Sequence, residues 1–179
     1  MVFMKMSYVK KLVLTAICAA LCVVVPMVFH AVPNGGVIFL PMHIPVLLCG
    51  MMCGWQYGLL CGLAGPLLSS LITGMPPAAV LPAMMLECGV YGLSTGLMMR
   101  YVRTGKNLAD LYISLTVSMV LGRVVSGIAK ALIFAPGTTL AGWATVSFVT
   151  GLPGIVIQLV LIPLLLTALE RAKLIPKRY

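Results

Sequence analysis

The feature that most constrains this chain is a series of long apolar stretches separated by short links rich in glycine, proline or basic residues. A helix needs about 20 mainly apolar residues to cross the hydrocarbon core of a bilayer. Hydrophobic residues fill 61% of the 179 positions and charged residues only 8%, whereas charged residues make up about a quarter of a soluble domain. The sequence therefore predicts an all-α integral membrane protein: a single bundle of six transmembrane helices covering residues 1–179.

The expected spans follow from the apolar stretches and from the prolines and glycines that interrupt them. They lie at about residues 9–28, 43–55, 58–73, 82–99, 111–134 and 148–169. The basic flank and apolar run near the N-terminus also resemble a signal peptide. That run is long enough to span, however, and the later segments need it as a packing partner, so we expect it to be the first transmembrane helix.

Basic residues indicate the orientation of these helices. Ten of the twelve lysines and arginines fall in three clusters: Lys5, Lys10 and Lys11; Arg100, Arg103 and Lys106; Arg171, Lys173, Lys177 and Arg178. If the N-terminus is cytoplasmic, all three clusters are cytoplasmic, and the external links at 29–42, 74–81 and 135–147 contain no lysine or arginine. The positive-inside rule therefore predicts cytoplasmic N- and C-termini in a multi-pass protein of the cell membrane. Three separated clusters do not form a nucleic-acid-binding patch.

The six cysteines occupy apolar helical stretches, where cysteine behaves as a small hydrophobic residue. The pairs Cys18/Cys22 and Cys49/Cys53 have a spacing of four residues that would suit a metal site, but no histidine stands at zinc-type spacing from them. We expect no metal. The remaining cysteines are Cys61 and Cys88.

Only three ionisable residues fall well inside the expected spans: Glu87, Arg123 and Lys130. Arg123 and Lys130 are two helical turns apart and share a face. At 1.5 Å per residue, Glu87 lies about 8 Å below the outer end of its span, Lys130 about 6 Å and Arg123 about 16 Å. Glu87 could pair with Lys130 or reach between both cations. A structural ion pair with a snorkelling lysine is one interpretation, but one acid cannot neutralise two cations, which favours a pocket that is open to the outside and binds a polar or anionic ligand.

Polar residues at the first external link are further candidates for this pocket. His30 and His43 flank the link, and Asn34 lies within it. Each histidine could equally be a hydrogen-bonded structural residue. We interpret Trp143, in the last external link, as an interfacial anchor rather than a lid.

Small residues repeat at intervals of four, a spacing that lets transmembrane helices approach closely. Ala16 and Ala20 form such a strip on the first span. The glycines that follow the same interval are Gly50, Gly54, Gly58 and Gly62, with a second pair at Gly92 and Gly96. We expect most of these glycines to pack helices against one another within the chain.

Several blocks together resemble the substrate-binding S components of energy-coupling factor (ECF) transporters, which import vitamins into prokaryotes. The resemblance covers nearly the whole chain and rests on six short spans, the Ala16/Ala20 strip, and the blocks FLPMHIPVLLCG, PLLSSLITGMPP and GLPGIVIQLVLIP. It implies high-affinity capture of a vitamin from outside, with the first external link closing over the ligand and pocket residues drawn largely from spans four to six.

The resemblance also implies partners. Ala16 and Ala20 would face a transmembrane coupling subunit, and two partner ATPases would use the ATP, so the chain needs no cofactor of its own. The sequence has no phosphate-binding loop of the G-x-x-x-x-G-K-[ST] type, in agreement with this. The surplus positive charge favours a carboxylate vitamin such as pantothenate or nicotinate. A cobalamin-precursor heterocycle fits if Glu87 is protonated or pairs differently.

Three other classes of function compete with the interpretation as an S component. An enzyme is disfavoured, since three acidic residues cannot build a carboxylate-rich metal site and no nucleophile stands beside a histidine and an acid. A stand-alone secondary transporter or channel could use Glu87, Arg123 and Lys130 as an ion or proton relay, but six spans without an obvious inverted repeat are few for alternating access. A structural subunit would use the same charges to hold partner helices.

Overall fold

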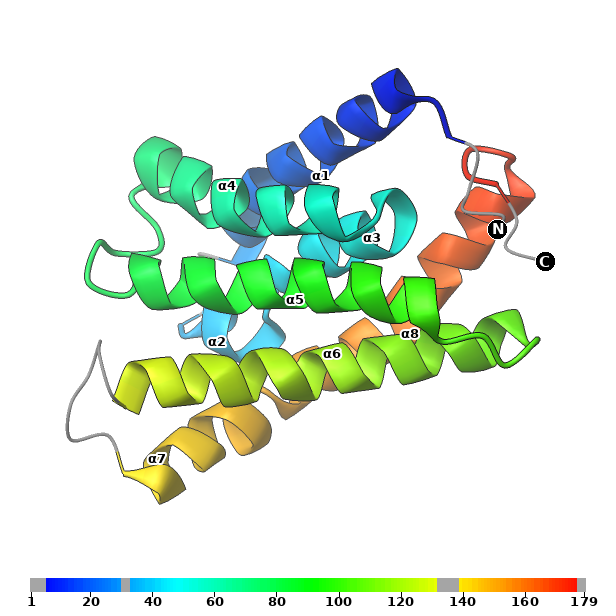
Figure 1. Cartoon of the computed structure of the whole chain (residues 1–179). Coiled ribbons are helices and arrows are strands. Elements are labelled where there is room, and N and C mark those ends of the chain that lie inside the picture. Colours follow the sequence, from blue (N-terminus) through cyan, green and yellow to red (C-terminus); the bar gives the residue numbers. More distant parts are fainter. Residues whose placement is uncertain (1–5, 30–32, 132–138, 177–179) are drawn as a thin grey trace.

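The computed structural model describes residues 6–29, 33–131 and 139–176. All regular structure in these ranges is helical, and Figure 1 shows the arrangement. The elements in chain order are α1 (Tyr8–Phe29), α2 (Gly35–Phe39), α3 (His43–Cys53), α4 (Trp55–Thr73), α5 (Leu81–Tyr101), α6 (Asn107–Ala129), α7 (Leu140–Ala144), the π-helical turn η2 (Thr145–Thr150) and α8 (Leu152–Arg171).

Five helical segments in the described residues are long and apolar enough to cross a membrane: α1, the combined α2–α3 stretch, α4, α6 and α8. The all-α membrane class is therefore confirmed. Helix α5 has 21 residues, a sufficient length, but Glu87, Tyr91, Ser94 and Thr95 make it more polar than the others. The count of six crossings stays a prediction.

The first external link contains more structure than the sequence indicates. The apolar residues within it form α2, and Leu40, in a left-handed conformation with φ of 51°, joins α2 to a short α3. Near the other end of the chain, the expected last span begins at about residue 148. The wider π-helical turn η2 covers Thr145–Thr150, so the regular helix α8 begins only at Leu152. The final expected residues of the fifth span, 132–134, lie outside the described residues.

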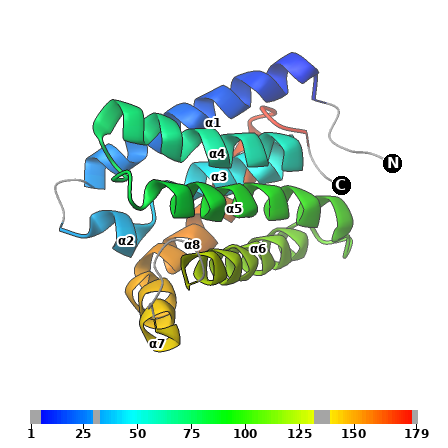
Figure 2. The same ribbon diagram turned by 60° about the vertical axis from the view of Figure 1, so that its left-hand side comes forward.

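Helices α4 and α5 lie side by side along their lengths in both ribbon views, with α3 against the same pair (Figures 1 and 2). Glycines make this approach possible. A methyl group on Gly92 would collide with the backbone of Gly58, and one on Gly62 would collide with the backbone of Cys88. These glycines pack helices within the chain, as expected. Gly54 differs: a methyl group on it would meet nothing within 4 Å, and its φ of 100° makes the turn between α3 and α4.

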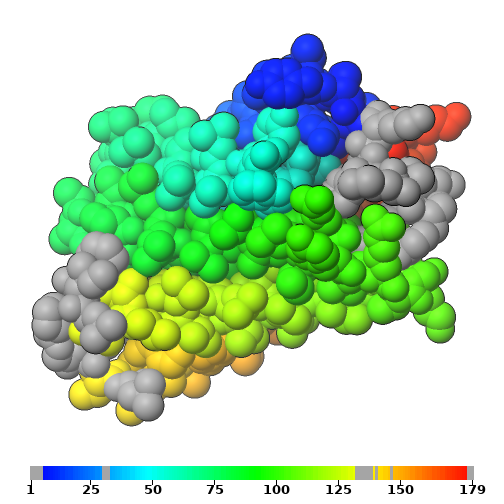
Figure 3. Space-filling view, viewed as in Figure 1, coloured from blue at the N-terminus to red at the C-terminus, as the bar shows by residue number. Residues whose placement is uncertain are grey.

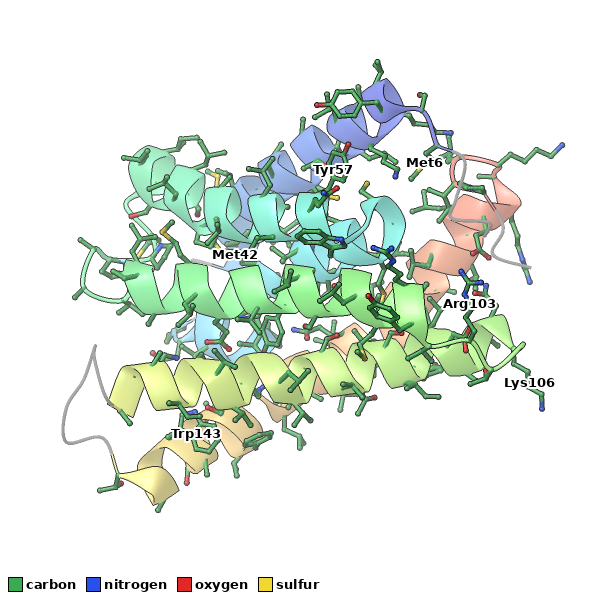
Figure 4. The ribbon with its side chains drawn as sticks, viewed as in Figure 1. Met6, Met42, Tyr57, Arg103, Lys106 and Trp143 are labelled. Carbon is green, nitrogen blue, oxygen red and sulfur yellow. The ribbon has the colours of Figure 1, made fainter. Side chains whose placement is uncertain are left out.

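Most of the described basic residues gather at one end of the bundle. The start of α1, the link from α5 to α6 and the end of α8 lie together on the right of Figure 1, and Figure 4 places Arg103 and Lys106 at this end. Two acids fasten the link to the bundle. Asp110 accepts hydrogen bonds from the backbone N–H and hydroxyl of Thr104, at 2.8 and 2.7 Å, and Glu170 accepts one from Asn107 at 3.0 Å.

The remaining helices enclose the bundle less completely. Helix α8 crosses behind α5 and α6 and packs against its neighbours over short stretches only. In the space-filling view, the surfaces of α4, α5 and α6 follow one another without a break (Figure 3). The described cysteines are all buried free thiols and belong to the core that these helices share.

Gly92→Ala should destabilise the protein strongly, because the added methyl group meets the backbone of Gly58, which cannot move away as a side chain can. Overpacking of this kind costs about 1–3 kcal/mol, which corresponds to a melting temperature lower by about 2–12 °C. The six buried thiols allow the measurement: a thiol-reactive fluorescent dye reports their exposure during a thermal ramp in detergent. Gly36→Ala, on α2 with nothing within 4 Å, is the matched control. Equal melting temperatures for the two variants would contradict the close contact.

Candidate binding site between α3, α5 and α6

Glu87 of α5 is the centre of a cluster of polar side chains. Its Oε1 lies 3.6 Å from Nε2 of His43 and accepts a hydrogen bond of 3.3 Å from the hydroxyl of Tyr91. Its Oε2 lies 3.4 Å from Nζ of Lys130, which directly follows α6. Because three side chains hold the carboxylate and only 14% of the Glu87 side chain is exposed, this charge has a fixed position inside the bundle.

His43, the first residue of α3, is buried beside this carboxylate. Its ring meets the ring of Tyr91 edge to face, with 5.0 Å between centroids. Within the described residues, neither ring nitrogen makes a hydrogen bond, since the contact with Glu87 is too long for one. A buried polar group without a partner is unusual in a folded protein and calls for an explanation. His43 therefore has unused hydrogen-bonding capacity next to Glu87.

Arg123 of α6 is also buried, with 3% of the residue exposed, but it points to a different partner. Its Nε donates a 2.8 Å hydrogen bond to the backbone carbonyl of Ser147 in η2. Its guanidinium lies over the ring of Phe148, 5.7 Å from the centroid, a cation–π geometry. Among the described residues no carboxylate lies within ion-pair distance of Arg123, so its positive charge adds to that of the cluster.

The short helix α2 packs onto the start of α8 near Arg123. Gly154 approaches the backbone of Phe39 closely, and the buried Gln158 donates a 3.4 Å hydrogen bond to the carbonyl of Leu40. A methyl group on Gly151 would lie 3.3 Å from both Leu40 and the carbonyl of Ser147. The first external link, η2 and Arg123 therefore meet at one place.

The structure brings three of the expected pocket residues together and separates the others. Glu87, His43 and Lys130 form the cluster, and Lys130 is the cation that meets the acid. Arg123, two helical turns before Lys130, contacts η2 instead. Asn34 is exposed at the start of α2, and its side chain makes no capping hydrogen bond. His30 lies outside the described residues.

Sequence reasoning missed three residues of this region. Tyr91 stands four positions after Glu87 and so shares its helical face, a signal that was present in the sequence. Ser147 contributes only its backbone carbonyl, which leaves no residue-specific signal. Phe148, at the expected start of the last span, could not be told from a membrane-facing residue before Arg123 was known to lie beneath it.

Within the described residues, no group of three or more histidine, cysteine or acidic side chains could hold a metal ion. The chain has several apolar helices long enough to span a membrane, and the cluster around Glu87 lies between them. Together with Arg123, this region carries more positive than negative charge. Ionisable groups inside membrane segments mark paths or sites for ions and substrates. These features define the class of multi-pass membrane proteins that bind or carry a polar solute.

Comparison with known families identifies the member of that class. A family model described as "ECF transporter, substrate-specific component" matches residues 10–166, and the chain belongs to this family. No curated protein matches the chain. The protein is therefore the substrate-specific S component of an ECF importer: a substrate-binding transport subunit, not an enzyme. The family implies a small-molecule substrate and association with the ATPase and transmembrane subunits of an ECF module.

Arg123→Ala should loosen the segment that the arginine holds. Removal of the guanidinium takes away both the hydrogen bond to the Ser147 carbonyl and the contact with Phe148. We expect hydrogen exchange of the amides in Leu140–Thr150, followed by mass spectrometry in detergent, to be about tenfold faster, as the loss of a charged hydrogen bond worth at least 1.5 kcal/mol implies. Arg123→Lys can still donate to the carbonyl and should give an intermediate rate. Unchanged exchange in Arg123→Ala would show that this contact does not hold the segment.

Proposed function

We propose that the chain captures a vitamin or vitamin precursor from outside the cell with high affinity and delivers it to an ECF module for import. The observation that carries this proposal is the cluster of Glu87, His43 and Lys130, with the charge of Arg123 nearby. The start of α5 and the end of α6, which carry Glu87 and Lys130, lie at the end of the bundle opposite the basic link between these two helices (Figure 1). If the basic end is cytoplasmic, the cluster is near the outer face, where an extracellular ligand arrives.

The charges favour an anionic substrate. Glu87 neutralises at most one of the two cations, because its carboxylate already pairs with Lys130 while Arg123 contacts a carbonyl and an aromatic ring. A ligand carboxylate bound between Arg123 and Lys130 would compensate the remaining positive charge, which Arg123 carries. A small carboxylate vitamin, of the pantothenate or nicotinate kind, therefore fits the site. A cobalamin-precursor heterocycle is the second candidate, favoured by His43, whose ring nitrogens make no hydrogen bond within the described residues.

The outer face of α1 supports the proposed partner contact. Ala16 and Ala20 are both exposed and one helical turn apart, so another helix could approach this strip closely. We assign the strip to the transmembrane coupling subunit, with ATP used by the two ATPases of the module and no cofactor in this chain. A stand-alone transporter that used Glu87 and Lys130 as a relay would instead move its solute without these subunits, and uptake in cells that lack the module separates the two mechanisms.

Lys130→Ala should weaken vitamin binding at least about tenfold, since it removes a charged partner worth about 1.5–3 kcal/mol from the proposed carboxylate. Native mass spectrometry of protein purified from rich medium in mild detergent would first identify the bound small molecule, and calorimetric titration of that molecule would give the affinities. Lys106→Ala, exposed at the opposite end of the bundle, is the matched control. Arg123→Ala should also weaken binding. Unchanged affinity in both the Lys130 and Arg123 variants would show that the cluster is not part of the binding site.

The proposed orientation, with six crossings and both termini in the cytoplasm, has its own test. Because the native cysteines are buried, a membrane-impermeant thiol reagent applied to intact cells should label only an introduced, exposed cysteine. We expect Gly36→Cys and Thr139→Cys to react from outside, and Lys106→Cys and Lys173→Cys to react only after the cells are opened. Labelling of Lys106→Cys in intact cells would show that the protein has the opposite orientation in the membrane.

A further inference from the structure

Three buried oxygen atoms without a hydrogen-bond partner lie along one face of α6. They are Oδ1 of Asn107 and the hydroxyl oxygens of Ser114 and Ser118. Elsewhere in the described residues, only His43 and Trp143 have buried side-chain nitrogen or oxygen atoms of this kind. Because each residue turns an α-helix by about 100°, the three positions fall within about 40° of one another around the axis. We call Asn107, Ser114 and Ser118 the α6 row.

The two serines of the row lie deep in the bundle, each with 0% of its surface exposed. A hydroxyl inside a helix can bond to the carbonyl four residues earlier, as the hydroxyls of Thr15 and Ser94 do. Within the described residues, Ser114 and Ser118 make no such bond. Since buried polar groups in folded proteins nearly always have partners, two such hydroxyls in one row indicate that another molecule bonds to them.

Each end of the α6 row leads to charged groups. At the basic end of the bundle, the amide of Asn107 donates a 3.0 Å hydrogen bond to Glu170 of α8. At the other end, Gly122 lies one helical turn beyond the row and touches the ring of Tyr91. The hydroxyl of Tyr91 in turn donates to Glu87. The row and Gly122 together extend about 22 Å along the helix axis, so they connect the basic end with the Glu87 cluster.

Water is the molecule that fits this row. Side chains four residues apart on a helix are about 5–6 Å from each other, and one water molecule that bonds to both at about 2.8 Å spans that distance. The sequence from Asn107 to Gly122 contains no lysine or arginine and only one acid, Asp110, so a charged occupant would be poorly compensated. Buried waters typically bond to polar groups that the protein leaves unsatisfied.

We propose that the α6 row holds a file of internal water molecules that hydrates the Glu87 cluster from the basic end of the bundle. Ser114 and Ser118 bond the middle of the file, and the hydroxyl of Tyr91 joins it to the carboxylate. A ligand held by charged groups leaves only when water takes over their solvation, so the file assists release of the substrate toward the basic end. This role in release rests on the proposed function, whereas the presence of the water file does not.

X-ray radiolysis of the full-length protein in detergent tests the file directly, because hydroxyl radicals formed from bound water oxidise the side chains beside it. Leu115 and Met119 each follow one of the two serines and are 0% and 4% exposed. Leu47 and Met51 of α3, 0% and 2% exposed, are the matched controls. We expect mass spectrometry to show several-fold more oxidation of the α6 pair, and the double variant Ser114→Ala/Ser118→Ala to lower it to the control level. Equal oxidation of the two pairs in the unmodified protein would overturn the file.

The sign of a stability change provides a second test. Dry hydroxyls would be unsatisfied, so their removal in Ser114→Ala or Ser118→Ala would raise the melting temperature. Hydrated hydroxyls lose hydrogen bonds instead, and we expect each variant to melt about 1–6 °C lower. Ser126→Ala is the matched control, because this serine is on the same helix, 1% exposed, and donates to the carbonyl of Arg123 at 3.2 Å. Higher melting temperatures for both row variants, with a lower one for Ser126→Ala, would contradict the proposal.

Uptake distinguishes the failure of this inference from that of the proposed function. The double variant keeps every residue of the Glu87 cluster, so calorimetry with nicotinate and pantothenate should give the affinities of the unmodified protein. In cells that express the ECF module, however, its uptake of the radiolabelled vitamin should be several-fold slower. Normal uptake together with lost oxidation would overturn the role in release. If the unmodified protein binds neither vitamin and no small molecule co-purifies, the proposed function fails, and the radiolysis experiment still decides whether the water file exists.

Discussion

The contact between the backbones of α4 and α5 is the constraint on which the rest of the structure depends. Gly58 and Gly92 let the two helices approach until main-chain atoms touch, and Gly50 brings α3 against the same region of α5. In a membrane, close packing rather than the hydrophobic effect holds helices together. This seam fixes the rotation of α5, and that rotation turns Glu87 and Tyr91 away from α4, toward His43 and α6.

Once α5 is fixed, Glu87 organises the polar interior. A carboxylate in this position is stable only if other groups compensate for the loss of water. His43, Tyr91 and Lys130 do so from three directions. Gly122 contributes indirectly, because a side chain there would collide with the ring of Tyr91. The site is thus built by ordinary helix packing, with small residues on α6 at the points where large side chains from neighbouring elements must fit.

Much of the fold could be predicted from the sequence, and less of the site. The helices follow from apolar length, and the pairing of Glu87 with Lys130 agrees with simple counting along two antiparallel helices. The partner of Arg123 could not be predicted, because the backbone carbonyl of Ser147 carries no sequence signal. Gly54 shows a second limit of prediction from the sequence. It fits the four-residue repeat, yet its positive φ shows that it makes a turn, and spacing alone cannot tell a packing glycine from a turning one.

The two sides of the candidate site differ in how firmly the fold holds them. Glu87, His43 and Tyr91 lie on α3 and α5, which the glycine seam joins at main-chain distance. Trp143, Ser147 and Phe148 lie on a five-residue helix and a π-helical turn, which contact α6 at Arg123 and Gly127. Segments with few buried contacts open at low free-energy cost, and π-helical turns are frequent at functional sites. A ligand that binds between the two sides would meet a preformed charged wall and an adjustable aromatic one.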